Sequence, residues 1–289
     1  MTRKIELLAG YWTLAGDCYA MGPSEIATFS LRERVEAAAA AGYTGLGLVH
    51  QDFVHNAKSI GYPAMKRLFD DHGIAHIEVE FLGDWFEAGE KKAKSDRVRA
   101  DLLEAAHELR ARDIKCAGEM WTDKCDVAKM GDAFASVCAD ARKIGVTVAM
   151  EILPMSNVRT VETARAIVER GGEPNGGLCL DIWHFVRGGI DFAKIKTLPA
   201  TMINSVELDD AAAELKGTLW EDTLFHRLYP GEGSFDCPAF IDAVEQAGFR
   251  SFYGVEIINE TYRKLPLREQ AERSFKGAMA QFAKVADRV

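Results

Sequence analysis

Cysteine is scarce in this sequence and follows no spacing that forms a known motif. The 289 residues contain six cysteines, none of them in a C-x-x-C pair. Two lie inside apolar strand-like runs, where a free thiol behaves as a small hydrophobic group. The pattern does not indicate a disulfide framework and fits a reducing cytoplasm. The six are Cys18, Cys116, Cys125, Cys138, Cys179 and Cys237.

Long basic runs and long apolar runs are also missing. The formal net charge is −9, and Lys and Arg never cluster over more than a few residues, which argues against a phosphate backbone as partner. No apolar run approaches the roughly 18 residues of a membrane span, and the amino terminus lacks the apolar core of a leader peptide. We therefore expect a cytoplasmic protein that has neither nucleic acid nor membrane as a partner.

The sequence also lacks a glycine fingerprint and a flexible linker. Nothing like G-x-G-x-x-G follows the first apolar run, so a dinucleotide site has no support and an open doubly wound sheet is a weaker alternative. No Pro/Ser-rich stretch divides the chain. Eight strand-like runs alternate with helical patterns, and α/β barrels of roughly 250 residues form one domain. The sequence thus predicts a single (β/α)8 TIM barrel domain over residues 1–289.

The expected elements follow from apolar periodicity and from capping residues. Ser30 and Glu33 form a capping box at the start of the first helix, and Gly42 stops that helix. The expected strands are Ile5–Trp12, Gly45–His50, Ala75–Phe81, Ile114–Glu119, Val146–Glu151, Gly177–Asp181, Met202–Glu207 and Phe252–Glu256. The expected helices are Ser30–Ala41, Tyr62–Gly73, Lys92–Arg112, Val127–Ile144, Thr160–Arg170, Pro238–Ala247 and Leu267–Ala286, and Asp209–Asp236 is expected to be a polar loop.

Four of the expected strands end in a carboxylate. Glu151 closes the apolar run Val-Thr-Val-Ala-Met, and Asp181, Glu207 and Glu256 close the sixth, seventh and eighth strands. Parallel neighbours place these ends at one mouth, where the catalytic groups of barrels lie. Like charges gathered at one place need a cation to be tolerated. A divalent metal site held by these four residues is therefore the leading hypothesis.

Further polar residues stand near the same mouth. His184 follows Asp181 by three residues on the turn that leaves strand six, and Arg227 precedes the tight turn Pro-Gly-Glu-Gly. A role in substrate binding competes with a core histidine for His184 and with a mobile surface arginine for Arg227. Glu80 and Glu119 are weaker candidates. Four tryptophans near strand ends suit stacking on a sugar ring but are as readily core residues: Trp12, Trp85, Trp121 and Trp183.

Taken in order, these motifs resemble those of the xylose-isomerase-like TIM-barrel superfamily, which includes the AP endonuclease family 2 type barrel. That group holds sugar isomerases, ketose 3-epimerases, inosose isomerases and dehydratases, 3-dehydroshikimate dehydratases and the endonuclease IV type. The resemblance covers nearly the whole chain. The matching segments are Met-Glu151-Ile-Leu-Pro, Leu-Asp181-Ile-Trp-His184-Phe, Val-Glu207-Leu-Asp-Asp, Arg227 with Pro-Gly-Glu-Gly, and Val-Glu256-Ile.

The resemblance implies a role for each matching residue. It implies one divalent ion held by the four strand-end acids. Residues matching Glu151 and Glu256 exchange protons with the sugar in the family's epimerases, and residues matching His184 and Arg227 hold substrate oxygens. The strand-seven ligand is commonly His or Gln, whereas Glu207 stands here, and a more anionic site favours Mn²⁺ or Mg²⁺ over Zn²⁺. Mn²⁺ is the expected ion, Mg²⁺, Co²⁺ and Zn²⁺ stay open, and a homo-oligomer, a dimer or tetramer, is expected.

The chemistry that fits is removal of a proton next to a carbonyl in a small sugar or polyol. A cation that faces the carbonyl and the adjacent hydroxyl lowers the cost of forming the enediolate. One carboxylate takes the proton and another returns it, which gives isomerisation or epimerisation. Loss of a β-hydroxyl would instead make the protein a dehydratase of the keto-inositol or 3-dehydroshikimate type. An AP-endonuclease-like DNA repair enzyme and a non-enzymatic binding barrel also stay open.

Overall fold

The computed structural model describes residues 4–286, and within them eight parallel strands close into a barrel in sequence order. Each strand pairs with the next, and β1 pairs with β8 to complete the ring. The predicted (β/α)8 fold is confirmed. The strands are β1 Leu7–Ala9, β2 Gly45–Val49, β3 His76–Leu82, β4 Asp113–Ala117, β5 Thr147–Glu151, β6 Gly176–Asp181, β7 Ile203–Leu208 and β8 Tyr253–Val255.

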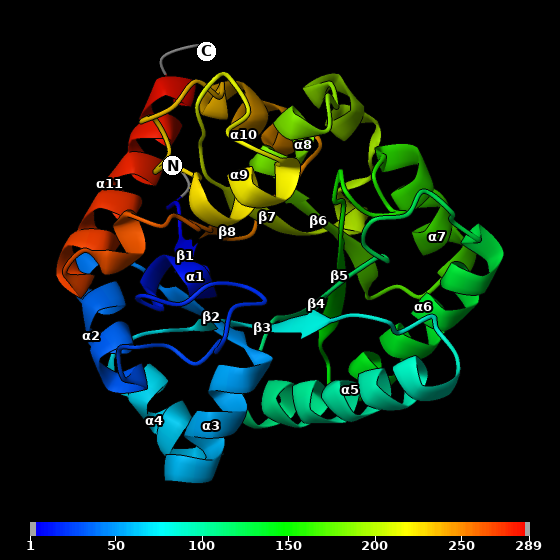
Figure 1. The fold of residues 1–289 in the computed structure, drawn as a ribbon, viewed down its shortest axis with the longest axis horizontal. Coiled ribbons are helices and arrows are strands. Elements are labelled where there is room, and N and C mark those ends of the chain that lie inside the picture. The colour runs from blue at the N-terminus through cyan, green and yellow to red at the C-terminus, as the bar shows by residue number, and fades with distance from the viewer. Residues whose placement is uncertain (1–3, 287–289) are drawn as a thin grey trace.

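Helices surround this ring of strands (Figure 1). Apolar side chains such as Leu48, Val79 and Val148 are fully buried in the core cluster that joins strands to helices. Within the described part of the chain, no helix combines the length and the apolarity needed to cross a membrane. The helices are α1 Tyr11–Leu14, α2 Leu31–Ala41, α3 His50–Ile60, α4 Tyr62–Asp71, α5 Gly89–Leu109, α6 Val127–Lys143, α7 Val161–Gly171, α8 Ile182–Arg187, α9 Leu219–Phe225, α10 Cys237–Gln246 and α11 Leu267–Ala286, with 3₁₀ turns at Phe192–Thr197, Ala200–Met202 and Tyr262–Lys264.

Several local expectations hold, and others need correction. The Ser30–Glu33 capping box forms at the start of α2, and Gly42 ends that helix with φ 112°. The expected loop 209–236 contains α9, which starts at a second capping box made by Thr218 and Glu221. That Thr-x-x-Glu pattern was readable in the sequence. The first strand is also shorter than expected, because Tyr11–Leu14 turns into a helix after Gly10.

Strand register decides which residues share the carboxyl-terminal mouth. Glu151 on β5 lies beside Cys179 on β6, and Asp181 lies beside Glu207 on β7. Glu256 follows β8, and its backbone N–H donates to the carbonyl of Leu208 at 3.2 Å. The fold therefore brings the four predicted acids to adjacent strand ends.

The barrel interior is unusually polar. Glu78 on β3 accepts a hydrogen bond from Ser205 Oγ on β7 at 2.9 Å, and Lys115 on β4 forms an ion pair with Glu207 on β7. These strands are not neighbours in the ring, so both contacts cross its interior. Barrels of this kind usually fill that space with branched apolar residues, which makes the charged filling a feature to be explained.

Candidate active site

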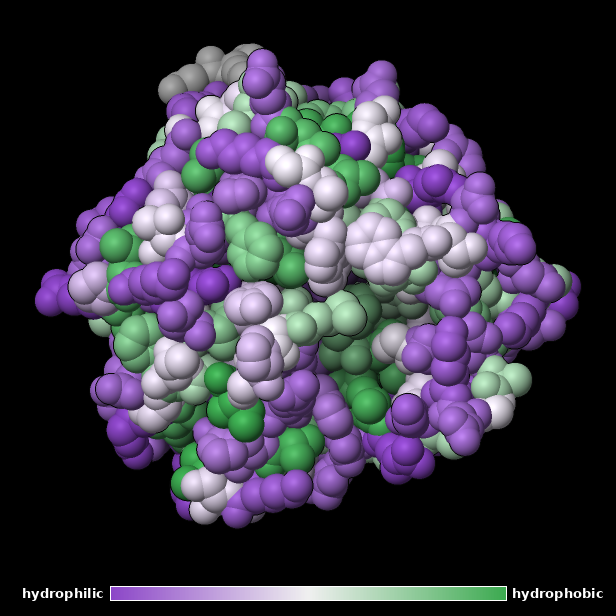
Figure 2. All heavy atoms as spheres, viewed as in Figure 1, coloured by the Kyte–Doolittle hydropathy of each residue, from purple (hydrophilic) through white to green (hydrophobic). Residues whose placement is uncertain are grey.

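A cavity of about 360 Å³ opens at the carboxyl ends of the strands. Glu80, Glu151 and Glu256 line it together with His184 and Arg227. The space-filling view shows a hollow near the centre of this face, with hydrophobic residues gathered in it (Figure 2). A polar end beside an apolar wall is typical of small-molecule sites. The apolar part of the wall includes Trp12, Val49, Met120, Met155, Trp220 and Ile258.

Donor atoms of the predicted ligands form overlapping groups of three, each close enough to share a cation. Among the described residues, ligand atoms of Asp181, Glu207 and Glu256 lie within 4.8 Å of one another, and the same is true of Glu151, Asp181 and His184. All five side chains are buried. Asp181 and Glu207 lie deeper than the others and do not line the cavity. The structure thus brings the four acids together and adds His184 to them.

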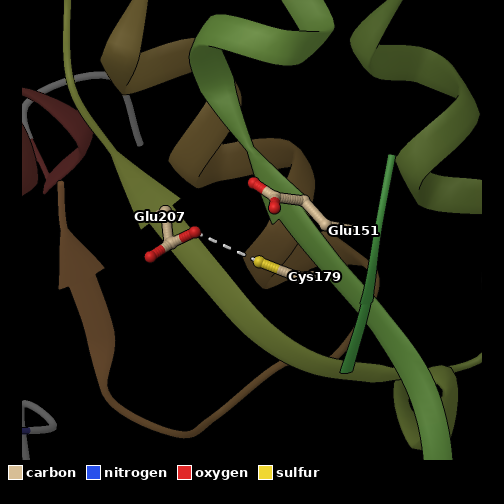
Figure 3. A group of neighbouring side chains, drawn as sticks. All are labelled: Glu151, Cys179 and Glu207. Atoms are coloured by element: carbon tan, nitrogen blue, oxygen red, sulfur yellow. Dashed lines mark hydrogen bonds between the residues drawn. The ribbon is translucent and has the colours of Figure 1, made fainter. Parts of the chain in front are cut away.

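A third group of possible ligands joins β5, β6 and β7. The carboxylates of Glu151 and Glu207 project toward one another from their strands, and Cys179 lies between and below them (Figure 3). The Cys179 thiol donates to Oε2 of Glu207 at 3.3 Å. Burial and the nearby Glu207 charge raise the pKa of Cys179 well above its usual value, so the thiol keeps its proton and serves as a hydrogen-bond donor.

Arg227 lies buried inside the site. The competing expectation, a mobile surface arginine, is wrong. Its NH1 group lies 2.7 Å from Oδ2 of Asp181, 2.7 Å from Oδ2 of Asp209 and 3.2 Å from Oε2 of Glu256. Burial opposes the charge, but these carboxylates outweigh it and raise the pKa of Arg227 well above its usual value. The guanidinium also lies over the Trp183 ring at 5.4 Å. Arg227 is therefore a permanent cation among buried acids.

Asp209 and Asp210 were not singled out in the sequence, although they directly follow strand seven. Asp209 pairs with Arg227. Asp210 accepts from the backbone N–H groups of Gly231, Gly233 and Phe235 at 2.9–3.0 Å. Its carboxylate therefore holds the Pro-Gly-Glu-Gly turn beside β7, the strand that carries Glu207, while Asp209 helps to hold Arg227.

His184 stands on α8, immediately after β6. Oδ1 of Asp181 accepts from the backbone N–H of Trp183 at 2.6 Å and so caps this helix. Nε2 of His184 then lies 3.1 Å from Oε1 of Glu151 and 3.6 Å from Oδ2 of Asp181. The Asp-x-x-His spacing works because the carboxylate caps the turn that turns the imidazole back toward the cavity.

The structure places the remaining candidate residues either at the cavity, in the core or on the surface. Glu119 is partly exposed and pairs with Lys91 at 3.0 Å, outside the cavity lining. Trp85 and Trp183 are core residues that donate to the Ala117 carbonyl and to Asp222. Trp121 is 63% exposed and contacts Trp220 edge to face. Trp12 lines the cavity, so stacking on a substrate ring is open to it and to Trp220, which the sequence did not indicate.

Lys115 is a further residue of the site that the sequence analysis did not single out. It is 2% exposed and lies 3.2 Å from Oε2 of Glu78 and 3.5 Å from Oε2 of Glu80, in addition to its ion pair with Glu207. Burial lowers the pKa of Lys115, but the three acids outweigh it and raise that pKa well above normal. The sequence did carry one sign of this role, a lysine inside the apolar run Asp-Ile-Lys-Cys-Ala. Lysines are almost never fully buried unless they are paired with an acid.

The site carries more buried acids than buried cations, and this favours a bound divalent ion. Burial raises the pKa of Glu80 to about 7 and that of Glu207 to about 8. Oε1 of Glu80 and Oδ1 of Asp209 are buried without a hydrogen-bond partner among the described residues. Oxygen donors in this number and charge suit Mg²⁺ or Mn²⁺. The acids concerned are Glu78, Glu80, Glu151, Asp181, Glu207, Asp209 and Glu256, against Lys115 and Arg227.

The raised pKa values predict that the metal-free protein loses stability as pH rises. The folded state binds protons on Glu80 and Glu207 more tightly than the unfolded state does, since their pKa values lie near 7 and 8 rather than at the ordinary 4.5. That contribution to the free energy of unfolding is complete below pH 4.5 and is lost as pH rises through 7 and 8. We expect the Tm of the metal-free protein to fall between about pH 4.5 and pH 8. Added Mn²⁺ should raise the Tm more above pH 8 than at acidic pH, because both carboxylates are then ionised.

Thermal denaturation of chelator-treated protein, with and without MnCl₂, tests this expectation. The variant Glu119→Gln is the matched control, because it removes a mouth acid that lies outside the buried cluster and should leave the pH profile unchanged. A metal-free Tm that climbs steadily from mildly acidic to alkaline pH would contradict the assignment.

A family model identifies the family of this chain, and named relatives match parts of it. A family model described as a xylose isomerase-like TIM barrel matches residues 35–281. The 3-dehydroshikimate dehydratase of Pseudomonas aeruginosa is 28% identical over 254 residues, which are 85% of this chain and 39% of that protein. The inosose isomerase of Bacillus velezensis is 31% identical over 174 residues, which are 60% of this chain and 56% of that protein. The chain thus spans between two fifths and three fifths of the length of these relatives.

Solved structures of other proteins share this fold. A xylose isomerase-like TIM barrel/4-hydroxyphenylpyruvate dioxygenase fusion protein superposes with a TM-score of 0.85 at 22% identity, over 99% of this chain and 44% of that one. The IolI protein with a bound zinc atom gives 0.78 at 21% identity, over 98% and 99%. An L-ribulose 3-epimerase gives 0.72 at 18% identity, over 98% and 97%. At these identities the likeness establishes the barrel architecture.

Proposed function

The chain belongs to the xylose isomerase-like TIM barrel family, and on that premise we propose that it is a divalent-metal-dependent enzyme that removes a proton next to a carbonyl of a small hydroxylated ketone. The observation that carries the proposal is the meeting of two acid–base groups with cation ligands in one cavity. Glu151 and Glu256 both line it, and Asp181 and Glu207 lie directly behind them. Such a site supports proton transfer at carbon.

The strand-end acids Glu151, Asp181, Glu207 and Glu256 would hold the ion, and Mn²⁺ is the proposed one because every ligand in that set offers oxygen. When bound, the ion supplies a Lewis acid that polarises a carbonyl oxygen. The protein supplies the proton carriers. Glu151 lies beside His184, which orients it. Burial and Glu207 raise the pKa of Glu256 well above normal in the metal-free protein, so this carboxylate has a high affinity for a proton that it can take up and return.

Isomerisation or epimerisation is the outcome that the geometry favours. Because Glu151 and Glu256 reach the same cavity from strands β5 and β8, a proton removed by one group can be returned by the other. Dehydration is the second candidate, since two relatives matched over 85% of this chain are named 3-dehydroshikimate dehydratase. Elimination needs the same first step followed by departure of a β-hydroxyl.

The charge of the cavity indicates a neutral substrate. Of the residues described as lining it, Arg227 is the permanent cation, and three carboxylates already share its charge. The two lining histidines are also engaged, His50 with Asp101 at 2.8 Å and His184 with Glu151. An anionic carboxylate or phosphate group would thus meet acids without a free cation. A ketose or keto-inositol fits better than an acid such as 3-dehydroshikimate.

The decisive experiment follows deuterium uptake by NMR. Metal-loaded enzyme is incubated in D₂O with ketoses, keto-inositols and 3-dehydroshikimate. Uptake with unchanged mass apart from the label supports isomerisation or epimerisation, while loss of water and new ultraviolet absorbance support dehydration. Absence of exchange together with absence of a stoichiometric divalent ion would favour a binding barrel instead.

His184→Ala should weaken substrate binding while the metal is retained. The imidazole lies against Glu151 and Arg227 and faces the cavity, so its loss removes a substrate contact while all four strand-end acids stay in place. We expect a higher KM, a smaller change in kcat and an unchanged metal content by elemental analysis. Loss of metal from the purified variant would show that His184 is a ligand.

An endonuclease activity has less support from the site. A three-zinc endonuclease centre is rich in histidine, whereas the possible ligand groups among residues 4–286 contain His184 as their one histidine. A homo-oligomeric state, a cytoplasmic location and the absence of nucleic-acid and membrane partners stay predictions. The single-domain boundaries 1–289 also stay a prediction, and both ends of that range lie outside the described residues.

A further inference from the structure

Lys115 projects from β4 into the barrel beneath the cavity. Its Nζ pairs with Oε1 of Glu207 across the interior, since β4 and β7 are not neighbouring strands. Glu78 and Glu80 on β3 complete its surroundings at 3.2 and 3.5 Å. The lysine is 2% exposed. A buried ammonium with this many acidic neighbours interacts strongly with them, because the barrel interior screens charge far less than water does.

The two oxygens of Glu207 have different partners. Oε1 faces Lys115, while Oε2 accepts the Cys179 thiol hydrogen on the side where Glu151 lies (Figure 3). The carboxylate is thus held at both ends in one orientation. Holding a ligand by an outer partner is the usual way in which proteins orient metal ligands and tune their charge.

Charge pairing in the site then follows a simple pattern. Each buried cation is shared by three acids. Lys115 lies among Glu207, Glu78 and Glu80, and Arg227 lies among Asp181, Asp209 and Glu256. Because seven buried acids face two buried cations, net negative charge remains for a divalent ion to meet. Without Lys115, the same space would hold Glu207, Glu78 and Glu80 with no adjacent permanent cation among the described residues.

We propose that Lys115 is the positioning residue and counter-ion of Glu207, so that Glu207 meets the cation through one oxygen and with its charge compensated. The role rests on the cation site proposed above. It explains why a fourth acid is tolerated in the buried part of the site. It also predicts that the two residues act as a unit, so that Glu207→Gln alone does more harm to ion binding than the change of both residues.

Calorimetric titration of metal-free protein with MnCl₂ tests the proposal without using activity. Glu207→Gln removes one of the three acids around Lys115 and leaves more of its positive charge unbalanced. We expect Mn²⁺ binding to weaken by at least the roughly 10- to 100-fold that loss of an outer partner costs. Adding Lys115→Met removes that charge, and we expect the double variant to recover about tenfold or more of this loss. A lysine with a merely structural role would give a double variant that binds no better than Glu207→Gln.

Two further variants complete the design. Lys115→Met alone leaves buried acids unpaired, so we expect a lower metal-free Tm and a larger rise with Mn²⁺ than in the wild type; if it does not fold, the double variant still decides. Lys91→Met removes the same charge from an exposed position and should leave Mn²⁺ affinity unchanged. If the wild type binds no Mn²⁺, the cation site itself is refuted; if it binds and the double variant shows no recovery, Lys115 alone is refuted.

Discussion

Glu151→Gln and Glu256→Gln should each lower turnover by at least about 100-fold, because positioned acid–base groups of this kind contribute about 10²- to 10⁴-fold. The amide keeps the shape of the carboxylate but can neither take nor return a proton. Both side chains are buried at the cavity wall, 7% and 6% exposed, where water is a poor substitute. Steady-state kcat on the best substrate of the panel measures the effect.

The deuterium experiment separates the roles of the two acids. The variant that lacks the base should show no uptake, whereas the variant that lacks the returning acid can still exchange the proton without forming product. Glu119→Gln is the matched control, since Glu119 pairs with Lys91 outside the cavity and should leave kcat unchanged. Circular dichroism confirms that each variant is folded. Near-wild-type turnover in either cavity variant would remove that residue from the mechanism.

Arg227→Met should destabilise the metal-free protein by about 3–5 kcal/mol, because removing one partner of a buried charge network leaves uncompensated charges behind. Asp181, Asp209 and Glu256 would all lose the cation that lies 2.7–3.2 Å from them. A divalent ion placed among these acids replaces part of that charge. We therefore expect Mn²⁺ to restore most of the lost stability, measured by denaturant unfolding.

Arg187→Met provides the comparison for this variant. Arg187 is also largely buried and pairs with Asp222 at 2.8 Å, away from the cavity wall. Its loss should destabilise the protein too, but Mn²⁺ should not restore that stability beyond its effect on the wild type. Equal rescue of both variants, or rescue of neither, would show that Arg227 does not belong to the cation site.

Sequence patterns identified the barrel because its elements have short-range causes. Alternating apolar runs, the Ser30–Glu33 cap and glycine stops such as Gly42 act within a few residues, so each element could be read on its own. The acids at strand ends stood out for the same reason, since an apolar run that stops at a carboxylate is a local event. The α9 helix was missed although Thr218 and Glu221 carried an equally local pattern.

The partners of those acids could not be read in the same way. Lys115 is 92 residues from Glu207, and Arg227 is 46 from Asp181, so no spacing rule connects them. Their contacts depend on barrel closure, strand register and the burial that makes each charge seek a partner. Residue order was thus enough for the architecture and for the acids of the mouth. The tertiary structure decided which cations face those acids and how many oxygens remain for a metal ion, because the closed ring of strands sets the distances across its interior.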